Sequence, residues 1–212
     1  MDIDCTDKEH GIFKKIALVA SELAVDSYVV GGFVRDKIIG RPTKDIDIVC
    51  VGDGNELANN VAAKFQPKPT VNHFKNFGTA QIKIADIDIE FVGARKESYS
   101  YDSRKPQVEA GTLEDDQKRR DFTINAMAVS LNKKDFGVLL DPFNGLHDIK
   151  LKILQTPLEP GITFSDDPLR MMRAVRFAAQ LDYNIAVPTF EAIRQNASRI
   201  KIVSSERIAE EL

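Results

Sequence analysis

Two short stretches decide the fold, Ser27-Tyr-Val-Val-Gly-Gly-Phe-Val-Arg-Asp36 and, soon after it, Asp45-Ile-Asp-Ile-Val-Cys-Val51. The first is typical of a strand that ends in a glycine pair and leads into a short helix. The second alternates acidic and apolar residues, as a strand with one buried face does. Because side chains two positions apart on a strand lie on the same face, Asp45 and Asp47 are expected to project together while the isoleucines enter the core.

The paired aspartates indicate a metal site. Two neighbouring carboxylates repel each other unless a cation neutralises them, and oxygen ligands favour Mg²⁺ that is shared with substrate phosphates. The pair Gly31-Gly32 lets the backbone approach a phosphate closely, so the combination predicts phosphoryl or nucleotidyl transfer. Two simpler interpretations stay open: an Asp-x-Asp sequence can be a solvated strand face, and a glycine pair can be only a turn.

The composition is that of an ordinary globular chain. It has 212 residues, of which 43% are hydrophobic and 29% charged, and can bury a substantial core. The formal net charge of −3 gives no general signal for nucleic-acid binding. The only cysteines are Cys5 and Cys50, and neither a leader segment nor a membrane-spanning run is visible. We therefore expect a reducing, cytoplasmic location.

The spacing of apolar residues predicts the other elements. Helices are expected over 12–23, 57–65 and 189–196 and from 204 onward, and a hairpin over 79–92. The polar stretch from Glu97 to Asp116 is expected to be a mobile loop. The segment from Arg119 to Ser130 starts charged and becomes apolar, which favours a helix that enters the core. A further helix is expected to begin at Asp167-Pro168, with these residues buried: Leu169, Met172, Val175 and Ala179.

Glu90 is a candidate third carboxylate of the metal site. It lies on the second strand of the expected hairpin, on the face opposite to Ile89 and Phe91. It either joins the aspartates at the metal or only orients a neighbouring group.

Five ordered motifs resemble the class II tRNA nucleotidyltransferases, which are the CCA-adding enzymes, and the related bacterial poly(A) polymerases. The resemblance runs from about Val29 to the end, although the family often has Glu-Asp where this chain has Asp166-Asp167. In order, the motifs resemble the catalytic, ribose-contacting, hinge, base-reading and last shared motifs: Val30–Asp36 with Asp45–Asp47, Arg119–Ala126, Asp141–Gly145 with Asp148, Asp166–Arg173, and Ser205–Ile208.

The resemblance implies an α+β fold. A nucleotidyltransferase head of the DNA polymerase beta type, with a mixed sheet and helices, is expected over residues 1–150, and a helical, base-reading neck over 151–212. The family has body and tail domains after the neck that hold tRNA. They are absent here, so we expect the chain to be a piece of a longer protein that needs them for firm tRNA binding.

The implied reaction joins C and A nucleotides from CTP and ATP to the 3′ end of tRNA and releases pyrophosphate. Asp45 and Asp47 would hold two Mg²⁺ ions. Three alternatives stay open: a poly(A) polymerase or an enzyme that adds only CC or only A, a non-catalytic nucleotide-binding module, and a nucleotidyltransferase that acts on a small molecule.

The resemblance also implies the nucleotide contacts. The amides of Gly31 and Gly32 would meet the triphosphate with Arg35 nearby, although Arg35 is equally well explained by an ion pair with Asp36. The ribose contacts would come from the second motif, namely Arg120, Asp121 and Asn125.

Base selection follows from donors and acceptors. Cytosine and adenine both present an amino donor beside a ring acceptor, so a carboxylate and a guanidinium match both, whereas guanine and uracil present the reverse order. Asp167 and Arg170, three residues apart on one helix, would supply these groups, unless Asp167 only caps the helix and Arg170 lies in solvent. Arg173 and Arg176 continue the basic face toward phosphate, with a solvated face equally open for Arg176.

Overall fold

The computed structural model describes residues 1–74, 78–100 and 103–212, and the chain forms two compact units. The first unit comprises Met1–Arg95, Ala110–Asp116 and Met127–Pro142, and the second comprises Lys96–Glu109, Gln117–Ala126 and Phe143–Leu212. Each unit therefore gathers segments that are distant in sequence. A catalytic head over 1–150 and a neck over 151–212 stay a prediction.

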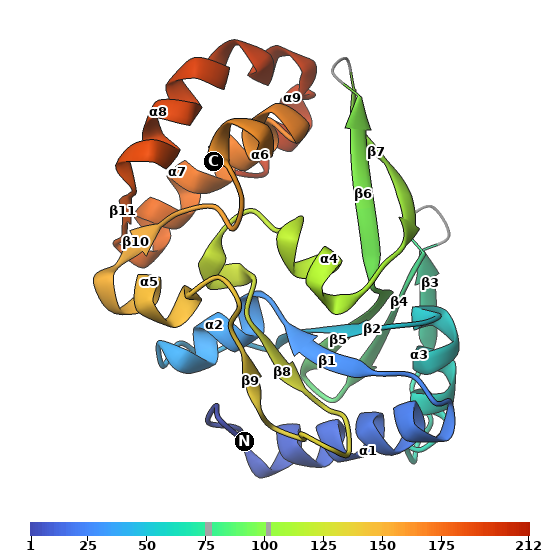
Figure 1. Cartoon of the computed structure of the whole chain (residues 1–212). Helices are drawn as coiled ribbons and strands as arrows, with labels where there is room; N and C mark the ends of the chain where they lie inside the picture. Colours follow the sequence, from blue (N-terminus) through green and yellow to red (C-terminus); the bar gives the residue numbers. More distant parts are fainter. Residues whose placement is uncertain (75–77, 101–102) are drawn as a thin grey trace. The chain divides into compact units, whose positions relative to one another are not determined.

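A seven-stranded mixed sheet forms the centre of the first unit, with the strand order β3-β4-β5-β2-β1-β8-β9 (Figure 1). β2 and β5 run parallel, and the other neighbouring strands are antiparallel. This confirms the mixed sheet that the sequence predicts. The strands are β1 (Ser27–Val30), β2 (Asp45–Cys50), β3 (Val71–Phe74), β4 (Thr79–Ile84), β5 (Ile87–Gly93), β8 (Ala128–Ser130) and β9 (Leu139–Leu140).

The two faces of the sheet differ in chemistry. Ile46 and Ile48 of β2 are buried on one face, and α1 (Asp7–Glu22) and α3 (Gly54–Ala62) pack against the sheet (Figure 1). Helix α1 begins at a capping box, as its sequence Thr6-Asp-Lys-Glu9 allows. The opposite face of β2 and β5 carries carboxylates near Asp45, the first residue of β2.

Helix α2 (Gly32–Ile38) follows β1 directly and is anchored to α1. Lys37 of α2 donates to the carboxylate of Glu9, with 2.7 Å between the nitrogen and the oxygen, and Glu9 is only 4% exposed. A largely buried ion pair with good geometry holds its partners in place more firmly than a surface pair does. The glycine turn before α2 is therefore attached to a fixed helix.

The second unit consists mainly of short helices. Phe164, Met171 and Ala192 form part of its core, and β10 (Ile153–Leu154) pairs in parallel with β11 (Asn184–Ile185). Among the residues that the structure describes, no helix is long and apolar enough to cross a membrane. The helices are α5 (Gly145–Leu151), α6 (Pro160–Asp166), α7 (Leu169–Leu181), α8 (Val187–Asn196) and α9 (Ser205–Ala209), with 3₁₀ turns η1 (Thr123–Asn125) and η2 (Ala197–Ile202).

The predicted loop from Glu97 to Asp116 is wrong. β6 (Arg95–Ser100) and β7 (Ser103–Ala110) form a two-stranded sheet, and α4 (Leu113–Lys118) follows it. The stretch is polar at almost every position, so neither a helical nor a strand period is visible in it. Residues 101–102 of the predicted loop lie outside the described residues.

The predicted helix from Arg119 to Ser130 is also wrong. The segment forms only the turn η1 and then β8, whose Val129 pairs with Val29 of β1. Pairing with a central strand overrides the weak helical pattern, and β-branched residues fit that strand.

Helix α7 exists as predicted, and Leu169 is buried as predicted, but the rest of the predicted buried stripe is wrong. Val175 is 51% exposed and Ala179 is exposed, while the buried residues include Met171, Ala174 and Phe177. Apolar residues occur all round this helix, so spacing alone did not fix which side faces the core.

Candidate active site

The first unit gathers carboxylates on one face of two parallel strands. In the strand register Asp47 of β2 lies opposite Glu90 of β5, and Asp45 lies opposite Asp88. Paired residues share a face of the sheet, so all four side chains lie on the side away from Ile46. We call these four residues the carboxylate face. Asp88 is bonded to Lys83 at 3.0 Å, and the sequence-predicted candidates Asp45, Asp47 and Glu90 lie on the same face.

Like charge on this face acts on Glu90. Partial burial and the negative charge of Asp47 raise the pKa of Glu90, against the lowering effect of Arg95. A divalent cation would relieve such repulsion, and carboxylate oxygens are the ligands that Mg²⁺ prefers, so the residues fit the metal. Within the described part of the chain, no three His, Cys, Asp or Glu side chains are placed to hold one ion. Asp45 and Asp47 as metal ligands, with Glu90 as a third, stay predictions.

The glycine turn lies beside the carboxylate face. Val30, the last residue of β1, is the register partner of Asp47, and Gly31 follows it immediately. Gly31 has φ 75° and ψ −137°, a conformation that only glycine adopts readily. Its amide donates to the carbonyl of Met127 at 3.3 Å, so the amide of Gly32, in the first turn of α2, is the better candidate for a phosphate contact.

Arg35 pairs with its neighbour Asp36. Its Nε donates to Oδ1 at 2.9 Å and its Nη2 to Oδ2 at 3.0 Å, and the Arg35 side chain is 7% exposed. A Cβ added at Gly32 would lie 3.6 Å from Nη2 of Arg35, so the guanidinium packs over the turn. This geometry supports the structural alternative, in which Arg35 stabilises the turn.

In the second unit, Asp121 is surrounded by donors. Its Oδ1 accepts from the Phe122 amide at 2.8 Å and from Nδ2 of Asn125 at 3.0 Å. Its Oδ2 lies 2.7 Å from both Nε and Nη2 of Arg173. A carboxylate has about four acceptor positions, so Asp121 has none left for a ribose hydroxyl. The structure supports a role in which Asp121 positions Arg173 and Asn125.

Electrostatics agrees with that role. Burial alone would raise the pKa of Asp121, but Arg173, Asn125 and Arg170 hold it below its ordinary value. Burial would lower the pKa of Arg173, but Asp121 and Glu211 raise it above its ordinary value. Arg120 donates from Nη1 to the Asn125 carbonyl at 3.3 Å, and a ribose contact by these two residues stays a prediction.

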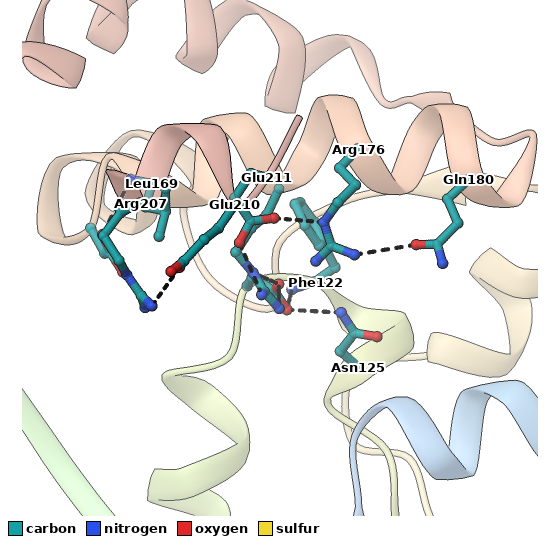
Figure 2. A network of polar contacts seen from close by, with 11 residues as sticks. Phe122, Asn125, Leu169, Arg176, Gln180, Arg207, Glu210 and Glu211 are labelled. Carbon is teal, nitrogen blue, oxygen red and sulfur yellow. Dashed lines mark hydrogen bonds and ion pairs between the residues drawn. The ribbon is translucent and has the colours of Figure 1, made fainter. Parts of the chain in front are cut away.

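Arg176 is bound to the end of the chain (Figure 2). Its Nε donates to Glu211 at 2.6 Å, its Nη1 donates to Gln180 at 3.2 Å, and its guanidinium lies 4.3 Å from the centre of the Phe177 ring. Glu211 also lies 3.6 Å from Arg173. We call Asp121, Arg173, Arg176 and Glu211 the guanidinium cluster.

Asp167 and Arg170 stand at the start of α7. Oδ1 of Asp167 accepts from the Leu169 amide at 3.2 Å, while the N-cap position of α7 is occupied by Pro168. Arg170 is 9% exposed, and its Nη2 and Nη1 donate to the carbonyls of Arg119 at 2.6 Å and Thr163 at 3.5 Å. Arg170 is thus held by main-chain acceptors and does not lie in solvent.

Sequence reasoning missed two charged residues of the second unit, Glu97 and Glu211. Glu97 forms an ion pair with Arg119 at 3.3 Å although it lies in the stretch predicted as a loop, where no period marked it. Glu211 follows the last motif, and no spacing in the sequence marked it.

Comparison of the sequence with known proteins identifies the family of this chain. The model of the poly A polymerase head domain matches residues 27–155, more than half of the chain. The chain belongs to this nucleotidyltransferase family. A second model, described as the probable RNA and SrmB-binding site of polymerase A, matches residues 182–212.

Relatives of this head domain include tRNA nucleotidyltransferases. The A-adding tRNA nucleotidyltransferase of Aquifex aeolicus is 40% identical over 188 residues, which are 88% of this chain and 22% of that protein. The CCA-adding enzyme of Ligilactobacillus salivarius is 38% identical over 189 residues, 88% of this chain and 44% of that protein. The chain thus spans less than half the length of both relatives.

A solved structure shares the fold. A tRNA nucleotidyltransferase complexed with a primer tRNA and an incoming ATP analog superimposes with a TM-score of 0.79 at 35% identity, over 92% of this chain and 54% of that one.

Proposed function

We propose that the protein adds C and A nucleotides from CTP and ATP to the 3′ end of tRNA and releases pyrophosphate. The observation that carries the proposal is the register of Val30 with Asp47, because it sets the glycine turn beside the paired carboxylates. A nucleotidyl transfer needs these two parts together, one for the phosphates and one for the metal. The relatives named CCA-adding and A-adding support the choice of RNA end and nucleotide.

Asp45 and Asp47 would hold Mg²⁺. The bound ion supplies charge neutralisation at the phosphates and lowers the pKa of a hydroxyl that it contacts. The residues of the turn do the rest: the Gly32 amide donates to a phosphate oxygen, and the pair of Arg35 with Asp36 keeps the turn in shape.

Base selection would fall to the start of α7. Asp167 accepts from the amino group shared by cytosine and adenine, and Arg170 donates to the neighbouring ring nitrogen. Two bonds from Arg170 to main-chain carbonyls support this assignment, since they fix the guanidinium before a base arrives. Uracil and guanine would leave both groups facing like partners, which a buried site rejects strongly.

We also propose that residues 1–150 act as the catalytic head and residues 151–212 as the helical neck. A cytoplasmic location is part of the proposal, and the free thiols of Cys5 and Cys50 agree with a reducing compartment.

A nucleotide-addition assay tests the function. The full-length protein is incubated with Mg²⁺ and a tRNA that lacks its 3′ CCA, together with each of the four nucleoside triphosphates singly and with CTP and ATP combined. The proposal expects C and A in the product and no U or G. Absence of any incorporation contradicts it, whereas metal-dependent CTP binding without incorporation favours a non-catalytic nucleotide-binding module.

An enzyme that adds only A is the second candidate, and the name of the 40% identical Aquifex relative favours it. A tRNA that already ends in CC separates the two. An A-adding enzyme extends this tRNA with ATP but leaves a tRNA without CC unchanged in CTP. A ladder of long products on unstructured RNA would instead indicate a poly(A) polymerase.

A further inference from the structure

Glu97 is a buried carboxylate that the proposed function does not use. It lies on β6 with only 4% of its side chain exposed, and its Oε1 lies 3.3 Å from Nη1 of Arg119, whose side chain is 19% exposed. Burial of an ion pair costs desolvation, so a pair that is kept inside needs other contacts to stabilise it or a role in positioning.

Arg119 connects this pair to the base-reading helix. Its carbonyl accepts the 2.6 Å hydrogen bond from Nη2 of Arg170, a residue 51 positions later in the chain. The bond from Nη1 of Arg170 to the Thr163 carbonyl is longer, at 3.5 Å. The direction of the Arg170 guanidinium therefore depends mainly on where the main chain at Arg119 lies, and the side chain of Arg119 is held by Glu97.

The charge of Glu97 also reaches the start of α7. Burial raises the pKa of Asp166, as do the charges of Asp167 and Glu97, while Arg170 and Arg199 lower it. Three carboxylates and two guanidinium groups thus interact here, and Arg199 donates to the Ser165 carbonyl at 2.8 Å.

We propose that Glu97 is a positioning residue for base selection, which acts through Arg119 on the guanidinium of Arg170. The inference rests on the proposed function, because it assigns a further residue to the same base-reading group. Loss of the Glu97 charge lets the Arg119 side chain move, the main chain at Arg119 shifts, and the donor of Arg170 no longer meets the ring nitrogen of cytosine or adenine. The discrimination against U and G then weakens more than the rate of addition.

The test compares Glu97→Gln, Arg119→Met and the double variant in the full-length protein. The readout is selectivity, the ratio of kcat/KM for CTP to that for UTP on tRNA lacking CCA, with binding of CTP and UTP measured in parallel by calorimetry. Each single variant is expected to lower selectivity about tenfold, the effect of losing one well-placed charged hydrogen bond. The double variant is expected to add little, because both changes break one connection.

A purely structural ion pair gives a different result. It would lower the melting temperature and leave selectivity unchanged, or the two single effects would add, and either outcome overturns the inference. Glu22→Gln is the matched control, since it removes a carboxylate that pairs with Lys64 at 2.9 Å on the first unit. Glu97→Asp serves if Glu97→Gln does not fold, and a smaller loss of selectivity is expected from it.

The outcome is separable from the proposed function. If the wild-type protein adds C and A selectively and the variants do so equally well, only the role of Glu97 fails. If the wild-type protein adds nothing, the calorimetric ratio of CTP to UTP still tests Glu97. If it neither adds nor binds these nucleotides, both proposals fail.

Discussion

The carboxylate face and the guanidinium cluster place acidic side chains in opposite settings. On β2 and β5, Asp47 lies opposite Glu90. Partial burial raises the pKa of Glu90, and the negative charge of Asp47 raises it further. In the second unit, Asp121 faces Arg173, and the positive charge holds the pKa of Asp121 low. Neighbouring like charges repel unless a cation neutralises them, whereas neighbouring opposite charges stabilise each other.

The difference separates chemistry from support. A group of like charges is unfavourable for folding and is retained where a ligand compensates it. A saturated ion pair can hold neighbouring groups in place, but it has little capacity left to bind a substrate. The carboxylate face is thus the better place to look for catalysis, and the guanidinium cluster the better place to look for stability.

The largest expected effect comes from the carboxylate face. Asp45→Asn or Asp47→Asn should lower the rate of nucleotide addition by about a thousandfold or more, because the proposed metal site needs both carboxylates. The melting temperature should stay the same or rise, since one of two repelling charges is removed. Single-turnover kinetics and thermal unfolding measure the two quantities.

Asp86→Asn is the control for this experiment. Asp86 is an exposed aspartate of the same unit that pairs with Lys8 and with Lys44. Its replacement should leave the rate unchanged. A strong loss of stability in Asp47→Asn, with the rate preserved, would show that the face is structural.

The guanidinium cluster should respond in the opposite sense. Asp121→Asn should lower the free energy of unfolding at about pH 7 by about 2 kcal/mol, because Arg173 loses its nearest carboxylate and keeps Glu211 at 3.6 Å. The pKa of Asp121 is lower in the folded state than its ordinary value of 3.8, so its stabilisation is complete above that pH and is lost as the pH falls through the folded pKa. Urea unfolding at several pH values should show the difference between variant and wild type shrink below about pH 4.

A difference that stays constant down to about pH 2 would contradict this account. It would mean that the packing of the side chain, and not its charge, stabilises the fold.

The glycine turn allows a finer comparison of support with chemistry. Gly31→Ala should cost about 1 to 3 kcal/mol of stability, since φ 75° with ψ −137° is strained for alanine. Gly32→Ala should fold normally, because the added Cβ meets only Nη2 of Arg35 at 3.6 Å. If a phosphate approaches the Gly32 amide, this methyl group should still raise KM for CTP about tenfold. An unchanged KM in Gly32→Ala would remove the amide from the phosphate site.

The pair Asp45 and Asp47 of the carboxylate face could be predicted from local rules, whereas the pairing of β2 with β5 that adds Asp88 and Glu90 joins residues 43 positions apart. Alternation along β2 places Asp45 and Asp47 on one side of the sheet. The hairpin of β4 and β5, which turns at Ala85-Asp86, fixes the side on which Glu90 lies. The glycine turn follows β1 directly, so its closeness to Asp47 needs only the pairing of two consecutive strands.

The guanidinium cluster could not be predicted because its partners are distant in the chain. Asp121 meets Arg173 across 52 positions, and Arg176 meets Glu211 across 35. Nothing in the spacing around Asp121 distinguishes a carboxylate that accepts from a ribose from one that accepts from an arginine. The hairpin of β6 and β7 was not predicted for a related reason. Its polar residues show no strand period, and the sequence does not reveal the pairing of the two strands.

The smallest expected effect concerns Arg176, which the sequence assigned to the nucleotide. Its side chain is 32% exposed and bound to Glu211, so Arg176→Ala should cost about 0.5 to 1 kcal/mol of stability, the range of a partly exposed ion pair. KM for CTP and ATP should change less than about twofold, because its donors serve Glu211 and Gln180. Arg173→Ala is the matched comparison on the same helix and should destabilise more, since its partner Asp121 is buried. A tenfold rise in KM for Arg176→Ala at unchanged stability would return Arg176 to the nucleotide site and weaken the division between the two regions.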